Sequence, residues 1–173
     1  MSRSKGPAVA LLGCLLLTSP DSLAAERFDH RGAVGLLLGG GFELGELVHS
    51  GQFDEYSRAV AELGLSVAVG ENGNEFKAVV QAGHVSELEW SVFGGYRGYF
   101  GQERLKTFFD LDLAFDVRPN FTAGPRLAFG AQYELHSLVG VFAGLDARLG
   151  IGSPSRFSAG VFAGIQIRSY LLE

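Results

Sequence analysis

The segment His84-Val85-Ser86 carries the residue types of a nucleophile and its general base. A histidine can take the proton of a nearby serine hydroxyl, whose oxygen then attacks a carbonyl carbon. Side chains two residues apart on a β-strand lie on the same face, and the alternation described below points both of these residues outward. Three residues are weak evidence for a catalytic site, and no acid that would orient the histidine can be placed. We therefore expect no enzyme and keep His84 and Ser86 only as weak catalytic candidates.

Charged residues of both signs recur at every second position of several segments. Between Leu105 and Val117, for example, three aspartates alternate with apolar residues. Buried charges are tolerated when they are paired. We therefore predict a network of paired charges that fills the interior of the fold. Its predicted members are Glu62, Lys77, Arg97, Lys106, Asp110, Asp112, Asp116, Arg126, Asp146, Arg148 and Arg168.

No other residues have the spacing of a metal or cofactor site. His49 and His136 have no companions at the spacing of metal ligands. The glycines Gly39–Gly41 lie within an alternating segment and not before a helix, so they do not form a phosphate-binding loop. We expect neither a metal nor a cofactor.

The first 25 residues have the layout of a secretory signal peptide. Two basic residues precede the apolar run Ala8–Leu17, and small residues follow at Ala24 and Ala25. The apolar run is too short for a membrane-spanning helix, which needs about 20 residues. We expect cleavage near Ala25, which leaves one domain over residues 26–173.

Cys14 lies inside the apolar run, and the preceding residues loosely resemble the site at which bacterial lipoproteins are cut and acylated. A lipoprotein becomes polar after its cysteine, whereas Leu15–Leu17 continue the run, so we prefer a cysteine that is discarded with the signal. The mature chain then has no cysteine, which excludes disulfides and thiol catalysis. Loss of two basic residues and one acidic residue changes the formal charge from −5 to −6, which disfavours binding to nucleic acid.

The rest of the chain alternates between apolar residues and polar or small residues with a period of two. In Val139–Leu149 the odd positions are apolar, and most even positions are glycine or charged. Such alternation predicts strands that are apolar on one face, and turn residues divide the chain into eight of them. The predicted strands lie near 32–43, 58–70, 75–83, 87–99, 104–117, 121–134, 137–149 and 156–169.

The connections are short, apart from residues 44–57, which we predict to form a longer loop containing Glu46, His49, Asp54 and Glu55. Two turns carry little signal. Apolar and polar residues keep alternating without a shift through the turn that we place at 83–87, so the sequence does not mark where one strand ends and the next begins. The turn near Leu135 is also poorly marked. Proline cannot donate to a sheet ladder, so we expect Pro125 to lie near the rim of the sheet or at a bulge.

The composition of the non-apolar face distinguishes a membrane barrel from a water-soluble barrel. It is rich in glycine, which costs about 0.5–1 kcal/mol of backbone entropy and gains nothing on a surface exposed to water. The narrow lumen of an eight-stranded barrel explains it, because long charged side chains there need very small neighbours. The predicted outward positions carry no charge, as lipid contact requires. Aromatic residues near the strand ends would form interfacial girdles: Phe42, Phe76, Trp90, Tyr96, Phe100, Phe121, Tyr133, Phe157 and Tyr170.

This architecture resembles the small outer-membrane barrels of the OmpA and OmpX type. The resemblance implies an all-β, up-and-down antiparallel transmembrane barrel of about eight strands in the outer membrane of a Gram-negative bacterium. It also implies contact with outer-membrane lipid and lipopolysaccharide, biogenesis through periplasmic chaperones and the barrel-assembly machinery, and a monomeric state.

Three roles remain open at this stage. We expect a structural, adhesion or narrow-pore protein with a largely filled lumen. The first alternative is a soluble, lipocalin-like binder of small apolar ligands. The second is a hydrolase similar to the outer-membrane lipid A deacylases, which carry a His-x-Ser pair on the lipid-facing wall; in this chain Glu87 replaces the asparagine that commonly follows that pair.

Overall fold

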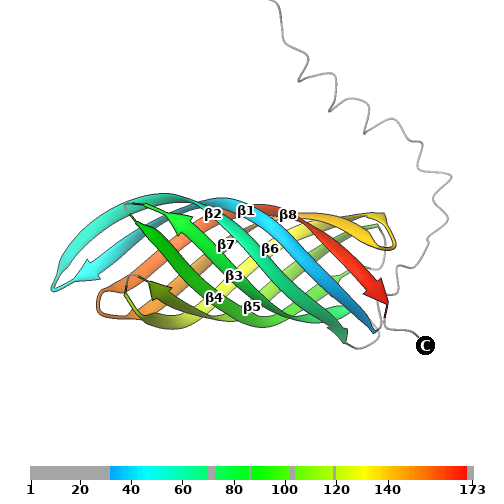
Figure 1. The fold of residues 1–173 in the computed structure, drawn as a ribbon, viewed down its shortest axis with the longest axis horizontal. Helices are drawn as coiled ribbons and strands as arrows, with labels where there is room; N and C mark the ends of the chain where they lie inside the picture. The colour runs from blue at the N-terminus through cyan, green and yellow to red at the C-terminus, as the bar shows by residue number, and fades with distance from the viewer. Residues whose placement is uncertain (1–31, 70–72, 86, 102–103, 119, 171–173) are drawn as a thin grey trace, which may run out of the picture.

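The computed structural model describes residues 32–69, 73–85, 87–101, 104–118 and 120–170. The predicted signal peptide, residues 1–25, lies outside these described residues. The described chain forms eight antiparallel strands in one closed barrel (Figure 1). In chain order they are β1 (Ala33–His49), β2 (Gln52–Val69), β3 (Asn74–His84), β4 (Leu88–Phe100), β5 (Leu105–Arg118), β6 (Thr122–His136), β7 (Val139–Gly152) and β8 (Ser155–Tyr170).

Each strand pairs with its neighbours in the sequence, and β8 closes the barrel against β1. This confirms the expected all-β, up-and-down barrel of eight strands. The start of β1 and the end of β8 lie at one end of the barrel, which we call the terminal end. The β1–β2, β3–β4, β5–β6 and β7–β8 turns lie at the other end, which we call the far end (Figure 1). No helix among the described residues is long and apolar enough to cross a membrane.

The predicted loop at 44–57 is wrong. β1 and β2 run through it, and the connection shrinks to Ser50 and Gly51, which both have positive φ angles of 51° and 82°. Two residues with positive φ make the tight hairpin turn that matches the twist of paired strands. Alternation fails here because this part of the hairpin projects past the neighbouring strand β3, so neither face is fully covered and both faces accept polar residues.

The other strand ends agree with the prediction to within about three residues, and the weakly marked turn at 83–87 is confirmed. Pro125 lies near the start of β6, opposite Leu113 of β5, and no bulge occurs there. The two irregularities lie elsewhere, between Trp90 and Ser91 and between Glu134 and His136.

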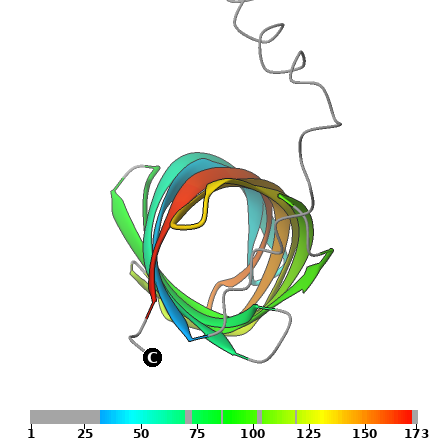
Figure 2. The same ribbon diagram turned by 90° about the vertical axis from the view of Figure 1, so that its right-hand side faces the viewer.

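The barrel is apolar outside and polar inside. Outward side chains such as Leu65 and Phe129 are 58% and 66% exposed, whereas the inward Arg97 is 2% exposed. The view along the barrel axis shows the strands as a closed ring around the lumen (Figure 2). The packed interior of this protein is therefore the lumen itself, and its buried side chains are predominantly polar or charged.

Candidate functional site in the barrel lumen

The lumen holds three groups of polar side chains stacked along the barrel axis. We call them the far cluster, the central cluster and the terminal cluster. The far cluster comprises Glu43, Tyr56, Arg58, Glu89, Ser91, Asp116, Thr122, Arg148 and Arg156; the central cluster comprises Glu62, Lys77, Gln81, Arg97, Asp110, Asp112, Arg126 and Asp146; the terminal cluster comprises Ser66, Glu75, Tyr99, Lys106, Gln132, Glu134, Gln166 and Arg168.

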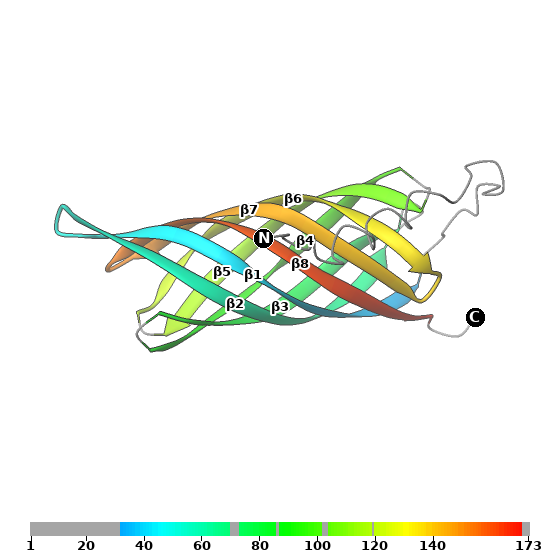
Figure 3. The ribbon, with the colours of Figure 1, turned by 90° about the horizontal axis from the view of Figure 1, so that it is seen from above.

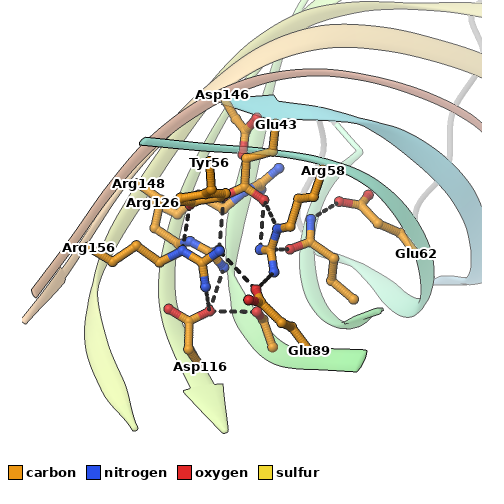
Figure 4. Close-up of polar contacts among 12 residues, drawn as sticks. Glu43, Tyr56, Arg58, Glu62, Glu89, Asp116, Arg126, Asp146, Arg148 and Arg156 are labelled. Carbon is orange, nitrogen blue, oxygen red and sulfur yellow. Dashed lines mark hydrogen bonds and ion pairs between the residues drawn. The ribbon is translucent and has the colours of Figure 1, made fainter. Parts of the chain in front are cut away.

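Arg58 is the centre of the far cluster (Figure 4). Its guanidinium forms ion pairs with Glu43, at 2.7 Å, and with Glu89, and only 1% of its side chain is exposed. Each of these carboxylates has a second cation, because Arg148 pairs with Glu43 at 3.0 Å and Arg156 pairs with Glu89 at 3.0 Å. The far cluster therefore alternates positive and negative charges that come from five strands, β1, β2, β4, β7 and β8.

Asp116 links the far cluster to the wall of β4 and β6. Its carboxylate accepts hydrogen bonds from the hydroxyls of Ser91, at 2.5 Å, and Thr122, at 2.6 Å. Arg148 approaches the same carboxylate at 3.2 Å. Several donors on one carboxylate offset the cost of removing it from water, so Asp116 is a satisfied buried carboxylate at this end of the lumen.

Asp110 and Asp112 organise the central cluster. Asp110 accepts a two-pronged hydrogen bond from Arg97, at 2.7 and 2.9 Å, and an ion pair from Lys77 at 2.8 Å. Asp112 bridges Lys77 at 2.9 Å and Arg126 at 2.8 Å. Both carboxylates have side chains that are 0% exposed, so they are protected from the screening that weakens surface ion pairs.

Aromatic rings fill the space around the central cations. The Arg97 guanidinium lies 4.0 Å from the ring centre of Phe108, and that of Arg126 lies 4.2 Å from the ring centre of Phe93. The rings in turn need glycine beside them. A Cβ atom on Gly144 would come within 2.8 Å of the Phe162 ring, so no larger residue fits there without displacing it. Gly130 and Gly164 lie in the same way beside the rings of Phe108 and Phe142, so ring packing accounts for several of the inward glycines.

The terminal cluster is built around Gln166 and Arg168 of β8. The Gln166 side-chain amide donates to Glu75 at 2.8 Å and to Ser66 at 2.9 Å. Arg168 donates hydrogen bonds to the carboxylate of Glu134 at 2.8 Å and to the side-chain oxygen Oε1 of Gln166 at 2.6 Å. Gln166 and Glu134 are both 0% exposed, so this end of the lumen is also closed.

Two small cavities lie among the described residues of the lumen. One cavity of about 10 Å³ lies beside Arg97, Glu62 and Phe142 in the central cluster, and another of about 20 Å³ lies beside Asp116 and Arg156 at the far end. A single water molecule needs about 10–15 Å³. In this conformation neither cavity is large enough for a continuous water path.

The structure places every member of the predicted charge network on the lumen side. All of them except Glu62 form ion pairs, and Glu62 accepts a hydrogen bond from the Gln81 side-chain amide at 3.0 Å. Sequence reasoning missed several partners: Glu43, Arg58, Glu75, Glu89, Glu134 and Arg156. These residues keep the inward phase of their strands, so the alternation could have identified them. All of them lie within three residues of an end of a predicted strand, where the alternation is weakest.

The predicted aromatics all lie on the outer surface of the barrel. Trp90, Phe121 and Phe157 lie near strand ends at the far end. At the terminal end, Phe76 lies near the start of β3, and Phe100, Tyr133 and Tyr170 lie near strand ends. Phe42 and Tyr96 lie further inside their strands.

The weak catalytic candidates do not form a site that can be described. His84 is exposed at the end of β3, and Ser86 lies outside the described residues. No cluster of three or more potential metal ligands occurs within the part of the chain that the structure describes. The expectation that the chain is no enzyme stays a prediction.

No protein-family model matches the chain, and no curated protein sequence matches it. Two solved structures are similar. Neisserial surface protein A (NspA) is 13% identical, with 79% of this chain and 96% of that chain covered and a TM-score of 0.57. The N-terminal β-barrel domain of Pseudomonas aeruginosa OprF is 14% identical, with 79% and 98% covered and a TM-score of 0.52. The chain thus has the fold of the small eight-stranded outer-membrane barrels, as its resemblance to the OmpA and OmpX type implies.

Proposed function

We propose that this protein is an integral outer-membrane barrel of a Gram-negative bacterium with a closed lumen, and that it serves as a structural or adhesion protein. The observation that carries this proposal is the inverted distribution of polarity. Large apolar side chains cover the outside of all eight strands, while the buried charges lie in the lumen. A water-soluble protein of this size would expose the charges and bury the apolar residues.

The outer surface supports insertion into a bilayer. The outward positions of β5 from Leu105 to Val117 contain one threonine and six apolar residues, and no charge. An arginine or lysine at the middle of a bilayer would cost about 2–4 kcal/mol. Because the barrel is closed, its strands hydrogen-bond to neighbours on both sides, which pairs backbone N–H and C=O groups that hydrocarbon could not solvate. We propose that lipid and lipopolysaccharide surround the barrel, which chaperones and the barrel-assembly machinery deliver to the membrane.

The interior of the barrel argues against the soluble, lipocalin-like alternative. A lipocalin-like binder needs an apolar interior with room for its ligand, whereas this interior is charged and the larger described cavity is about 20 Å³. A drug-sized ligand needs a pocket of about 300 Å³ or more.

The ion pairs of the lumen support a closed state and not an open pore. An ion passing through would have to separate Arg97 from Asp110 and Arg58 from Glu43, which are buried pairs. Breaking a buried pair costs about 3–5 kcal/mol. We therefore propose that the narrow-pore role does not apply to the conformation described here.

Membrane insertion can be tested by fractionation and gel migration. The mature chain is expected in the outer-membrane fraction, soluble only with detergent, and its band is expected to shift when the sample is boiled before denaturing electrophoresis. Trp90, the single tryptophan, is 39% exposed on the outer surface and should show blue-shifted fluorescence in lipid vesicles. Recovery as a soluble monomer without detergent would refute the proposal.

The closed lumen can be tested separately in planar bilayers. The unmodified barrel is expected to give no resolved single-channel current. A variant with Phe142→Ala and Phe162→Ala serves as the positive control, because it removes two rings that line the central cavity. Steady conductance of the unmodified barrel would show that its ion pairs open, and would restore the narrow-pore role.

A further inference from the structure

The first seven residues of β2 have a strand on only one side. β2 pairs with β1 along its whole length, up to the pair His49–Gln52. Its ladder with β3 begins only at the pair Ala59–His84. The stretch Gln52–Arg58, which we call the free edge, therefore has no paired strand among the described residues on the side facing away from β1. No other stretch of comparable length is unpaired on one side within the described chain.

The free edge lies on the hairpin that extends furthest at the far end (Figure 1), and its last residue, Arg58, has its side chain buried in the lumen. The β1–β2 hairpin projects beyond the other turns at the far end (Figures 1 and 3). Its outer face becomes polar at Glu46, Glu55 and Ser57, so this part lies beyond the apolar belt. The base of the hairpin is held by Tyr56, whose hydroxyl accepts a 2.5 Å hydrogen bond from Arg156. The base of the free edge is thus fixed against β8.

An unpaired edge exposes a row of backbone N–H and C=O groups that can bind another extended chain. The side chains along the edge indicate which chain would fit. Glu55 lies directly opposite Glu46 on the outer face, and like charges in that position destabilise a sheet. Neither carboxylate forms an ion pair in the described structure, and nor does the neighbouring Asp54. Phe53, next along the edge, is 67% exposed.

We propose that the free edge of β2 binds an extended, basic segment of a protein partner as an added strand. A lysine or arginine in the added strand would lie beside Glu55, about 4.5–5.5 Å away between Cβ atoms, and relieve its repulsion with Glu46. A second basic residue would lie beside Asp54, and an apolar residue beside the exposed ring of Phe53. The matching segment therefore has two adjacent basic residues followed or preceded by an apolar one.

The charges along the edge disfavour a second copy of this chain as the added strand. Two free edges that pair antiparallel about Glu55 would place the two Glu55 side chains opposite each other and add both Asp54 side chains nearby. The repulsion that disfavours this arrangement is the feature that favours a basic partner. The proposal rests on the strand register and on the side chains along the edge, and not on membrane insertion, so it stands whether or not the barrel spans an outer membrane.

The test uses the full mature chain in detergent and a short synthetic peptide. The peptide contains Lys-Lys-Phe flanked by alternating threonine and valine, with both ends blocked. Binding is measured by fluorescence anisotropy, and amide hydrogen exchange is followed at residues 52–58. We expect binding with a Kd below about 1 mM and slower exchange at the free edge. A peptide with the same side chains but N-methylated at alternate amides should not bind, because it cannot pair as a strand.

Two protein variants separate specific pairing from general attraction between opposite charges. Glu55→Lys is expected to weaken binding by about tenfold or more, whereas Glu87→Lys, which changes the charge equally at the β3–β4 turn, should have little effect. Equal weakening by both variants, equal binding of the N-methylated peptide, or unchanged exchange at 52–58 would each overturn the proposal.

Discussion

Replacing Asp110 by asparagine should destabilise the barrel more than the same change at Asp146. Asp110 accepts two hydrogen bonds from Arg97, at 2.7 and 2.9 Å, and pairs with Lys77 at 2.8 Å, with a side chain that is 0% exposed. Asparagine keeps the shape but loses the charge, and it turns a donor group toward one of these cations. Removing one member of a buried ion pair costs about 3–5 kcal/mol, and we expect a loss in that range.

Asp146 provides the matched control. Its carboxylate pairs with Arg126 at 2.8 Å, its side chain is 16% exposed, and Arg126 keeps Asp112 as a second partner. A hydrogen bond to a charged group contributes about 1.5–3 kcal/mol, and partial exposure reduces this, so Asp146→Asn should cost about 1–2 kcal/mol.

The free energy of unfolding can be measured by urea titration in detergent micelles or vesicles, with the fluorescence of Trp90 as the signal. Band migration of unboiled samples provides a second, independent readout of the folded fraction. Equal losses for the two variants, or a stable Asp110→Asn barrel, would refute the view that paired charges hold the lumen together.

Three further outcomes are expected. Leu113→Arg, on the outer face where the leucine is 51% exposed, should cost about 2–4 kcal/mol in vesicles, whereas Ser57→Arg on the projecting hairpin should be nearly neutral; equal effects in the same urea titration would contradict a lipid-facing belt. Gly144→Val should cost about 1–3 kcal/mol because it collides with the Phe162 ring, and an unchanged unfolding midpoint would contradict that packing. The purified barrel should release no acyl chain from lipid A; release that His84→Ala abolishes would support the deacylase alternative instead.

Alternation predicted the inward face wherever both faces of a strand were well defined. It identified the phase of Asp110 and Asp112 because each is flanked by outward apolar residues along β5. It failed at residues 44–57, where β2 runs past the end of β3 and polar residues occur on both faces of the β1–β2 hairpin. The length of that hairpin, and the free edge that it creates, are consequences of how far the neighbouring strand extends.

The amino-acid sequence alone determined the period, the phase and the chemistry of each face, because side chains on a strand point alternately to its two sides. The sequence alone could not determine which acidic side chain forms an ion pair with which basic side chain. Glu43 and Arg148 are 105 residues apart and come within 3.0 Å because the closed barrel turns β1 and β7 toward the same part of the lumen. Strand register and barrel closure, which arise from the whole sheet, decided the partners, and the narrow lumen decided that rings such as Phe162 must lie beside glycine.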